Sequence, residues 1–182
     1  GLGAVLTRMG TPIAWIADKI HPEDLDRFSA TLGDSAFTTT WEALTILVAL
    51  RAWTPLFPSG TRFALRFDSL GALASIAKSA SPSKGLSLIL QEIALDEAGQ
   101  VWGFDSLTHK PGVSNTLADP LSRLHAHDSQ TIPLFLTTFP TTPPLYTSAP
   151  AHVPHFLPLT HSRTTFIPTL STISRPTPPH TL

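Results

Sequence analysis

Hydrophobic and polar positions follow two different periods along roughly the first two thirds of the chain. Two short runs rich in apolar, β-branched and aromatic residues, 2–7 and 13–17, flank a Met-Gly-Thr-Pro turn, which predicts an antiparallel hairpin. Residues 61–67 alternate, with Phe63, Leu65 and Phe67 on one face, and this period of two predicts a strand. A further apolar run at residues 101–107 predicts another strand.

The clearest helical pattern runs from about residue 39 to residue 53 and ends before Pro55. This segment is apolar nearly all round, with Arg51 as the exception, which is typical of a helix buried in a core. Thr39 and Glu42 have the spacing of a capping box at its start. Glu42 also lies on the same face of this helix as Ile46, Ala49 and Trp53, so its carboxylate is predicted to point towards the core.

The remaining helical patterns decide the fold class. Helices are predicted over residues 70–79 and 86–98, with a helical turn or two in residues 21–34 and a last short helix after Asn115. The strands before and after the middle helices are then parallel neighbours joined by a right-handed crossover. We therefore predict an α/β domain with a mixed sheet.

The composition changes abruptly after about residue 129. Asp, Glu and Lys are absent from there on, and 11 of the 18 prolines fall in this part. Such a sequence offers no packed core, so residues 125–182 are predicted to be a Pro/Thr-rich tail that is either disordered or spuriously translated. A Pro-rich docking segment is the alternative, although no repeated PxxP array is present.

Length, charge and cysteine content set outer limits. The chain has 182 residues, a formal charge of −1 and no cysteine, which allows one domain and a tail and excludes disulfides and thiolate metal sites. No apolar run reaches the roughly 18 residues that a membrane span needs. The chain starts with an apolar run at residues 1–6 that has neither an initiator Met nor basic residues, so we expect a fragment rather than a signal peptide.

Candidate chemistry begins with the sequence from Thr108 to Leu124. His109 precedes a Pro-Gly turn, Asn115 precedes an apolar run, and Asp119 follows ten residues after the histidine. A histidine beside a carboxylate can handle protons. The alternative is a surface loop in which Asn115 caps a short helix and Asp119 complements the helix dipole.

Three carboxylates stand out by their position: Glu42 in a buried helix, Asp68 at the carboxyl end of a strand, and Asp119. Each has an ordinary explanation, as capping-box partner, N-cap and dipole complement respectively. Together they predict one cluster at an edge of the sheet, which Mg²⁺ or Mn²⁺ would neutralise. Two such ions about 4 Å apart can promote phosphodiester cleavage.

Four motifs carry a resemblance to a known family. They are G-L-G-A-V-L at residues 1–6, T-T-W-E-A-L at 39–44, R-F-D-S-L at 66–70, and H-K-P-G-V-S-N-T-L-A-D-P-L-S-R-L at 109–124. With these motifs the chain resembles the ribonuclease H domain of retrotransposon reverse transcriptases, of the LTR, Gypsy-like or DIRS-like kind. The resemblance covers residues 1–124, and the last motif is the most specific.

The resemblance implies a ribonuclease H-like mixed five-stranded sheet with flanking helices, and hydrolysis of the RNA strand of RNA–DNA hybrids. In that family four acids hold two Mg²⁺ ions. Glu42, Asp68 and Asp119 match three of these acids, and His109 matches a mobile histidine that moves protons or helps product leave.

The resemblance also implies partners and a location. Asn115 is expected to be structural or to contact the backbone of the hybrid, and Ser69 is expected to contact nucleic acid. The chain would work beside an upstream reverse transcriptase domain of a polyprotein, in a cytoplasmic or nuclear retroelement particle, neither secreted nor bound to a membrane.

Two departures from the family pattern matter. The family's first aspartate lies on a central strand just before G-L-G-A-V-L, and this chain starts after that strand, so we expect the chain alone to be inactive and poorly folded. Pro120 directly follows Asp119 and is expected to affect the start of the last helix.

Three other functions compete with the nuclease. They are a non-catalytic ribonuclease H-like binding or connection module, an integrase-like nuclease, and a Pro-rich interaction protein. In the integrase-like set the glutamate comes last in sequence, whereas Glu42 comes first here.

Overall fold

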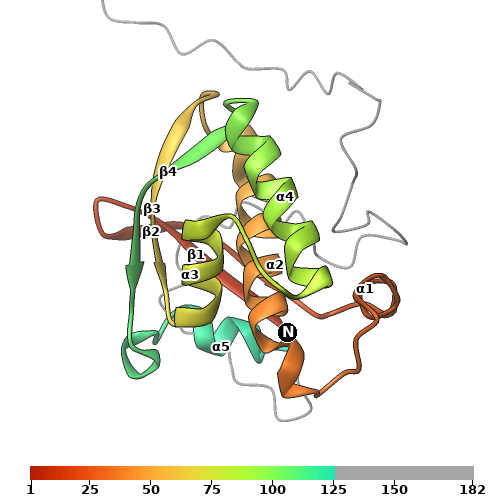
Figure 1. Ribbon diagram of the computed structural model, residues 1–182. Helices are drawn as coiled ribbons and strands as arrows, with labels where there is room; N and C mark the ends of the chain where they lie inside the picture. Colours follow the sequence, from red (N-terminus) through yellow and green to blue (C-terminus); the bar gives the residue numbers. More distant parts are fainter. Residues whose placement is uncertain (126–182) are drawn as a thin grey trace, which may run out of the picture.

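The computed structural model describes residues 1–125, so the predicted tail lies outside the described residues except for His125. Within this part the chain has an α/β fold, with one antiparallel pair of strands, one parallel pair, and helices packed against them (Figure 1). The α/β class and the presence of both kinds of strand pairing confirm the prediction at this level.

Each predicted strand and helix is present, and the ends of the four strands and of α2, α3 and α4 differ from the prediction by at most two residues. The strands are β1 Leu2–Arg8, β2 Thr11–Asp18, β3 Thr61–Phe67 and β4 Trp102–His109. The helices are α1 Pro22–Phe28, α2 Thr38–Trp53, α3 Leu70–Lys78, α4 Lys84–Ala98 and α5 Ala118–Ser122, with turns of 3-10 helix at Ser35–Phe37, Thr54–Leu56 and Gly112–Ser114.

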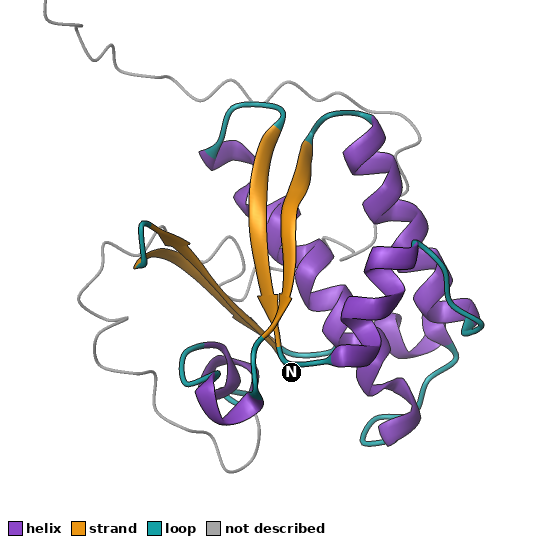
Figure 2. Ribbon diagram, turned by 60° about the vertical axis from the view of Figure 1, so that its left-hand side comes forward, coloured by secondary structure: helices purple, strands orange, loops and turns teal. Residues whose placement is uncertain are grey.

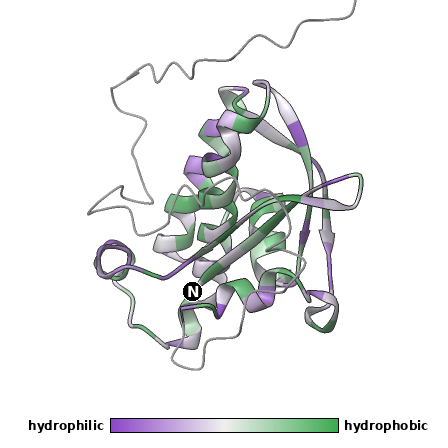
Figure 3. Ribbon diagram, turned by 180° about the vertical axis from the view of Figure 1, so that it is seen from behind, coloured by the Kyte–Doolittle hydropathy of each residue, from purple (hydrophilic) through white to green (hydrophobic). Residues whose placement is uncertain are grey.

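The strands β1 and β2 form the predicted hairpin, paired from Leu2 with Asp18 to Arg8 with Thr11. The two turn residues Met9 and Gly10 both have positive φ, 52° and 80°. That conformation is typical of the tight turns whose twist matches a hairpin, and glycine adopts it without steric strain. Hydrophobic colours run along this hairpin, whereas β3 and β4 are paler or hydrophilic over much of their length (Figure 3).

The strands β3 and β4 are parallel, as predicted, and Phe67 lies beside His109 at their carboxyl ends. A bulge after Phe63 shifts the register. The backbone groups of Phe104 at this irregularity find side-chain partners, because its N–H donates to Glu97 Oε1 at 3.2 Å and its carbonyl accepts from Arg62. The bulge is therefore a satisfied feature that sets which residues meet at the carboxyl edge.

The predicted single mixed sheet is not formed by residues 1–125. Instead β1 pairs with β2 alone and β3 with β4 alone, as two separate two-stranded sheets (Figure 2). Each sheet contributes one apolar face to a common core, which also contains most of α2 and the apolar face of α4. Hydrophobic burial between layers, rather than a continuous ladder of hydrogen bonds, thus joins the two sheets.

The helix α2 is the centre of this core, as its nearly uniform apolar sequence predicts. It packs against β1, β2, α3 and α4, and 12 of its residues are buried. The exception, Arg51, forms ion pairs with Glu92 and Asp96 of α4, at 2.7 and 2.8 Å. A charged residue in this position is therefore tolerated because its charge is matched across the helix pair.

The predicted capping box at the start of α2 is wrong. The helix begins at Thr38, directly after the 3-10 turn, and its N-cap residue Phe37 makes no side-chain cap. The cap lies one turn earlier, where Asp34 accepts a hydrogen bond from the N–H of Ala36. Glu42 therefore lies inside the helix with its side chain free for another contact.

The short helix α5 covers the face of the hairpin opposite to α2. Leu121, which is fully buried, forms a second small apolar cluster with Ala17 of β2. The approach is close, since a Cβ added at Gly3 of β1 would come within 2.6 Å of the Ala118 carbonyl oxygen. Within residues 1–125 no helix is long and apolar enough to cross a membrane.

Candidate functional site

Glu42 and Asp68 come together where the first turns of α2 and α3 meet. Close contact between these turns is possible because α3 has a glycine there, and a Cβ added at Gly71 would lie 3.2 Å from Thr39 Oγ1. The N-cap of α3 is Ser69, whose hydroxyl accepts from the N–H of Ala72 at 3.2 Å. Asp68 is therefore not the N-cap that its sequence position suggested, and its carboxylate is available for other partners.

The electrostatics of Glu42 mark this pair as unusual. Burial raises the pKa of Glu42, a hydrogen bond from the Ser69 side chain lowers it, and the nearby charge of Asp68 raises it. One oxygen of this carboxylate, Oε2, is buried and has no hydrogen-bond partner. A half-buried acid with an unpartnered oxygen beside a second acid is destabilising unless a positive charge or a proton compensates it.

His109 and Asn115 approach Asp68 from the end of β4 and the loop that follows. His109 Nε2 lies 3.2 Å from the backbone carbonyl oxygen of Asp68, and the imidazole is exposed. The side-chain amide of Asn115 donates to Asp68 Oδ2 at 2.9 Å. The backbone N–H of Lys110 also donates to the Phe67 carbonyl, at 2.7 Å, which fixes the start of the loop beside β3.

Asp119 is not part of this pair. It lies in the first turn of α5, and its Oδ1 accepts from Nε and Nη2 of Arg123 at 3.2 and 3.0 Å. Its backbone N–H bonds to the Asn115 carbonyl at 3.3 Å, so it is one turn away from the residue that contacts Asp68. Pro120 follows inside the helix without breaking it, because the first-turn N–H groups need no intrahelical partner.

The predicted cluster of three carboxylates is therefore only partly assembled. Within residues 1–125 no group of three or more His, Cys, Asp or Glu side chains is arranged to hold a metal ion. Glu42 and Asp68 nevertheless fit a hard divalent cation, since they offer oxygen ligands, mutual repulsion and an oxygen that lacks a partner.

Asn115 does not cap a helix through its side chain, because that amide is used at Asp68 and the N-cap of α5 is Leu117. Two residues of the site were not assigned these roles from sequence. Ser69 links the α3 cap to Glu42, and its Ser-x-x-Ala spacing before an apolar helix was a usable signal. Arg123 stands four residues after Asp119, the spacing of a helical ion pair, and could have been anticipated as its partner.

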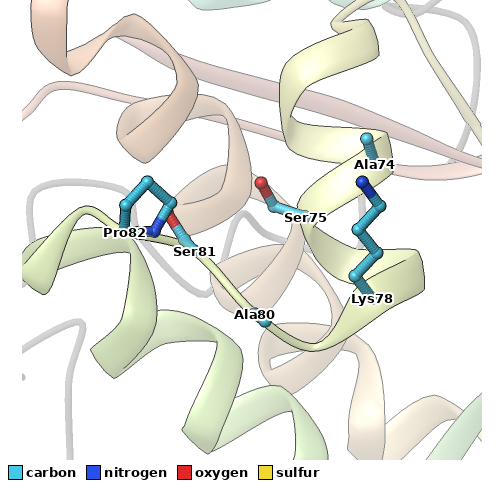
Figure 4. Close-up of a pocket in the computed structure, with 6 residues that line it drawn as sticks. All are labelled: Ala74, Ser75, Lys78, Ala80, Ser81 and Pro82. Carbon is cyan, nitrogen blue, oxygen red and sulfur yellow. The ribbon is translucent and has the colours of Figure 1, made fainter.

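A surface pocket lies elsewhere, between the end of α3 and the loop to α4 (Figure 4). It encloses about 350 Å³ and is lined by Ala74, Ser75, Lys78, Ala80, Ser81 and Pro82. No carboxylate lines it, and it sits at the opposite end of α3 from Asp68, roughly 13 Å along the helix. The pocket is therefore separate from the candidate site.

Comparison with known proteins adds no assignment to this geometry: the chain matches no protein-family model, no curated protein and no solved structure.

Proposed function

We propose that this chain is a ribonuclease H-type endonuclease domain of a retroelement reverse transcriptase, which hydrolyses the RNA strand of RNA–DNA hybrids with two Mg²⁺ or Mn²⁺ ions. The observation that carries the proposal is the pair Glu42 and Asp68 at the carboxyl end of β3, with the unpartnered Oε2 of Glu42. Open α/β sheets bind their ligands at this end of their strands.

In this proposal Glu42 and Asp68 hold the cations, and Asp119 joins them from α5 after leaving Arg123. When bound, the ions supply an activated water and neutralise the charge that develops on the leaving oxygen. His109, exposed beside Asp68, takes the role of proton carrier that the resemblance implies.

The proposal includes a fifth strand that carries the fourth acid. In the described part of the chain β1 and β3 each pair along one edge only. A strand placed between those two edges would join the separate sheets into the five-stranded sheet that the resemblance implies. It would also pair backbone groups that the ladders of β1 and β3 leave open.

A non-catalytic module that binds RNA–DNA hybrids is the second candidate. This candidate is favoured because Asp119 lies apart from Glu42 and Asp68 and forms an ion pair with Arg123. Such a module would retain the fold and the hybrid-binding surface without cleavage.

Hybrid cleavage tests the proposal, in the chain extended at its N-terminus by a strand that bears an aspartate. We expect Mg²⁺-dependent cleavage, abolished by Asp68→Asn because the amide keeps the shape but loses the charge that balances the cation. His109→Ala should slow turnover less, by about 10²–10⁴-fold. Asp105→Asn, at an exposed position of β4, is the matched control.

Three outcomes are informative. Near-normal cleavage by Asp68→Asn would show that Asp68 is not a ligand. Hybrid binding without cleavage in the extended parent would support the binding module instead. Loss of cleavage in Asp105→Asn as well would mean that the assay reports folding rather than chemistry.

A further inference from the structure

The contact between Asn115 and Asp68 joins residues that are 47 positions apart in sequence. Asn115 ends the 3-10 turn Gly112–Ser114, in the loop between β4 and α5. In the described part of the chain, its amide makes the side-chain hydrogen bond that ties residues 111–117 to another element. The loop otherwise holds itself through local backbone bonds, Ser114 to Pro111 and Asn115 to Gly112.

The chemistry of this contact differs from that of the other acid nearby. Asp119 has its charge matched by the guanidinium of Arg123, which takes up Oδ1 with two N–H groups. Asp68 instead accepts a hydrogen bond from the neutral amide of Asn115, which holds Oδ2 in place but does not neutralise a carboxylate. Within residues 1–125 Asp68 Oδ1 accepts no hydrogen bond from a side chain, so this oxygen is open to another ligand.

A neutral N–H donor on one oxygen can orient a carboxylate ligand without replacing the cation as its counter-charge. Hydrogen-bonded partners of this kind fix the orientation of metal ligands, and their loss typically weakens metal binding about 10–100-fold. A carboxylate without such a partner samples several rotamers, and each bound cation must then restrict them.

We propose that Asn115 is a positioning residue for the cation site: its amide holds Asp68 Oδ2 so that Oδ1 is presented to a divalent cation beside Glu42. The hydrogen bond between Asn115 and Asp68 also fixes the loop of residues 111–117 beside the site. Through this loop it positions α5, which carries Asp119. This inference rests on the proposed cation-binding function. Of the two roles expected of Asn115, structural support or contact with the backbone of the hybrid, it develops the first, and the second stays a prediction.

The first measurement uses the full-length chain without metal. Amide hydrogen exchange over residues 110–117 is compared in the parent, Asn115→Ala, Asp68→Ala and the double variant. We expect each single change to lower protection of this loop by about tenfold or more, and the double change to add little, because both remove one bond. Thr116→Ala, at the exposed neighbouring position, should leave protection unchanged.

The second measurement is Mn²⁺ binding to the same chains, followed by the electron paramagnetic resonance of free Mn²⁺. We expect Asn115→Ala to weaken binding about 10–100-fold and Thr116→Ala to leave it unchanged. Asn115→Leu, which fills similar space without an N–H donor, should behave like Asn115→Ala. Protection of β3 and β4 serves as the check that the variants are folded.

The results separate this inference from the proposed function. If the parent binds Mn²⁺ and Asn115→Ala binds it equally well, the positioning role is wrong and the site stands. If the parent binds no Mn²⁺, the positioning role fails, while hybrid cleavage by the extended chain still decides the proposed function. Loss of β3 and β4 protection in both Asn115 variants would make Asn115 a folding residue and would also overturn the positioning role.

Discussion

The two strand pairs of this protein are built in different ways. The hairpin β1–β2 closes through a two-residue turn and is covered on both faces, by α2 and by α5. The pair β3–β4 is closed by a connection through α3 and α4, and Arg62, Ala64 and Arg66 on one face of β3 are exposed. The hairpin is thus a local unit that is packed on both faces away from its exposed turn, whereas the parallel pair depends on contacts between distant residues.

This difference determines where chemistry can lie. The apolar hairpin presents two packed faces and offers no candidate ligand of its own to the site. The parallel pair ends in Asp68 and His109 at one edge, next to the first turn of α2. The segment from Lys110 to Leu124 joins the two units, because Asn115 bonds to Asp68 while α5 packs on Gly3.

The largest expected effect comes from joining the two pairs. We predict that an extended strand of about seven residues, fused ahead of Gly1 through a short turn, pairs with β1 and β3 and stabilises the protein. Several new backbone hydrogen bonds at about 0.5–1.5 kcal/mol each should raise the melting temperature by roughly 10 °C or more. Calorimetry provides the measurement.

The control for this extension is the same strand with proline at alternate positions, which removes donors from the ladder. Equal melting temperatures for the two extended chains would mean that the open edges of β1 and β3 do not accept a strand. The two pairs would then be independent sheets, and the ribonuclease H-like fold would lose its main structural support.

The second prediction tests whether α2 supports both pairs. Leu47 is fully buried in α2, so Leu47→Ala leaves a cavity and should lower the free energy of unfolding by about 2–5 kcal/mol. Hydrogen exchange should show β1–β2 and β3–β4 losing protection together. Leu95→Ala, at a position 52% exposed on α4, should change stability by about 0.5 kcal/mol or less. Loss confined to one pair would show that the two units unfold separately.

The sequence predicts the elements of this fold well because their periodicity is a local property. The alternation in β3 and the apolar α2 each reflect burial that the core imposes on every turn or every second residue. The parallel pairing of β3 and β4 also followed from connection rules. Whether the strands form one sheet or two depends on an edge partner, and no pattern within β1 or β3 encodes that.

The side-chain partners at the site were harder to predict, because several chemically similar groups compete for each role. Asp68 and Ser69 are both good N-caps, and the serine takes the position while the aspartate stays free. The amide of Asn115 could have capped a nearby helix but bonds 47 residues away. Only the three-dimensional packing of the loop on β3 decides between these choices.

The third prediction tests the packing of α5 on the hairpin. In Gly3→Ala the added methyl group would collide with the backbone of α5 at Ala118 and Ser122, neither of which can move as a flexible side chain could. We expect a loss of about 1–3 kcal/mol in denaturant unfolding and faster hydrogen exchange in α5, with β3 and β4 unaffected. Gly112→Ala is the matched control, since a Cβ there meets no atom within 4 Å. Equal stability of the two variants would show that α5 does not pack on the hairpin.

The smallest expected effect is the pH dependence of stability that Glu42 contributes. Because burial and the charge of Asp68 raise the pKa of Glu42 above its ordinary value of 4.5, the unfolded chain loses this proton at lower pH than the folded protein does. Stability from this group is therefore fully present below pH 4.5 and is lost as the pH rises through the raised pKa. Glu42→Gln removes the penalty, so the metal-free variant should be more stable than the parent at pH 7 and equally stable at pH 4.

Urea unfolding of the parent and of Glu42→Gln at these two pH values provides the measurement. Asp105→Asn, the exposed control, should shift stability by no more than about 0.5 kcal/mol at either pH. Adding Mg²⁺ at pH 7 should stabilise the parent and leave Glu42→Gln largely unchanged, because a cation favours the charged carboxylate that the variant lacks. A variant that is less stable than the parent at pH 7 without metal would mean that Glu42 is already compensated within the fold, and that the pair with Asp68 needs no cation.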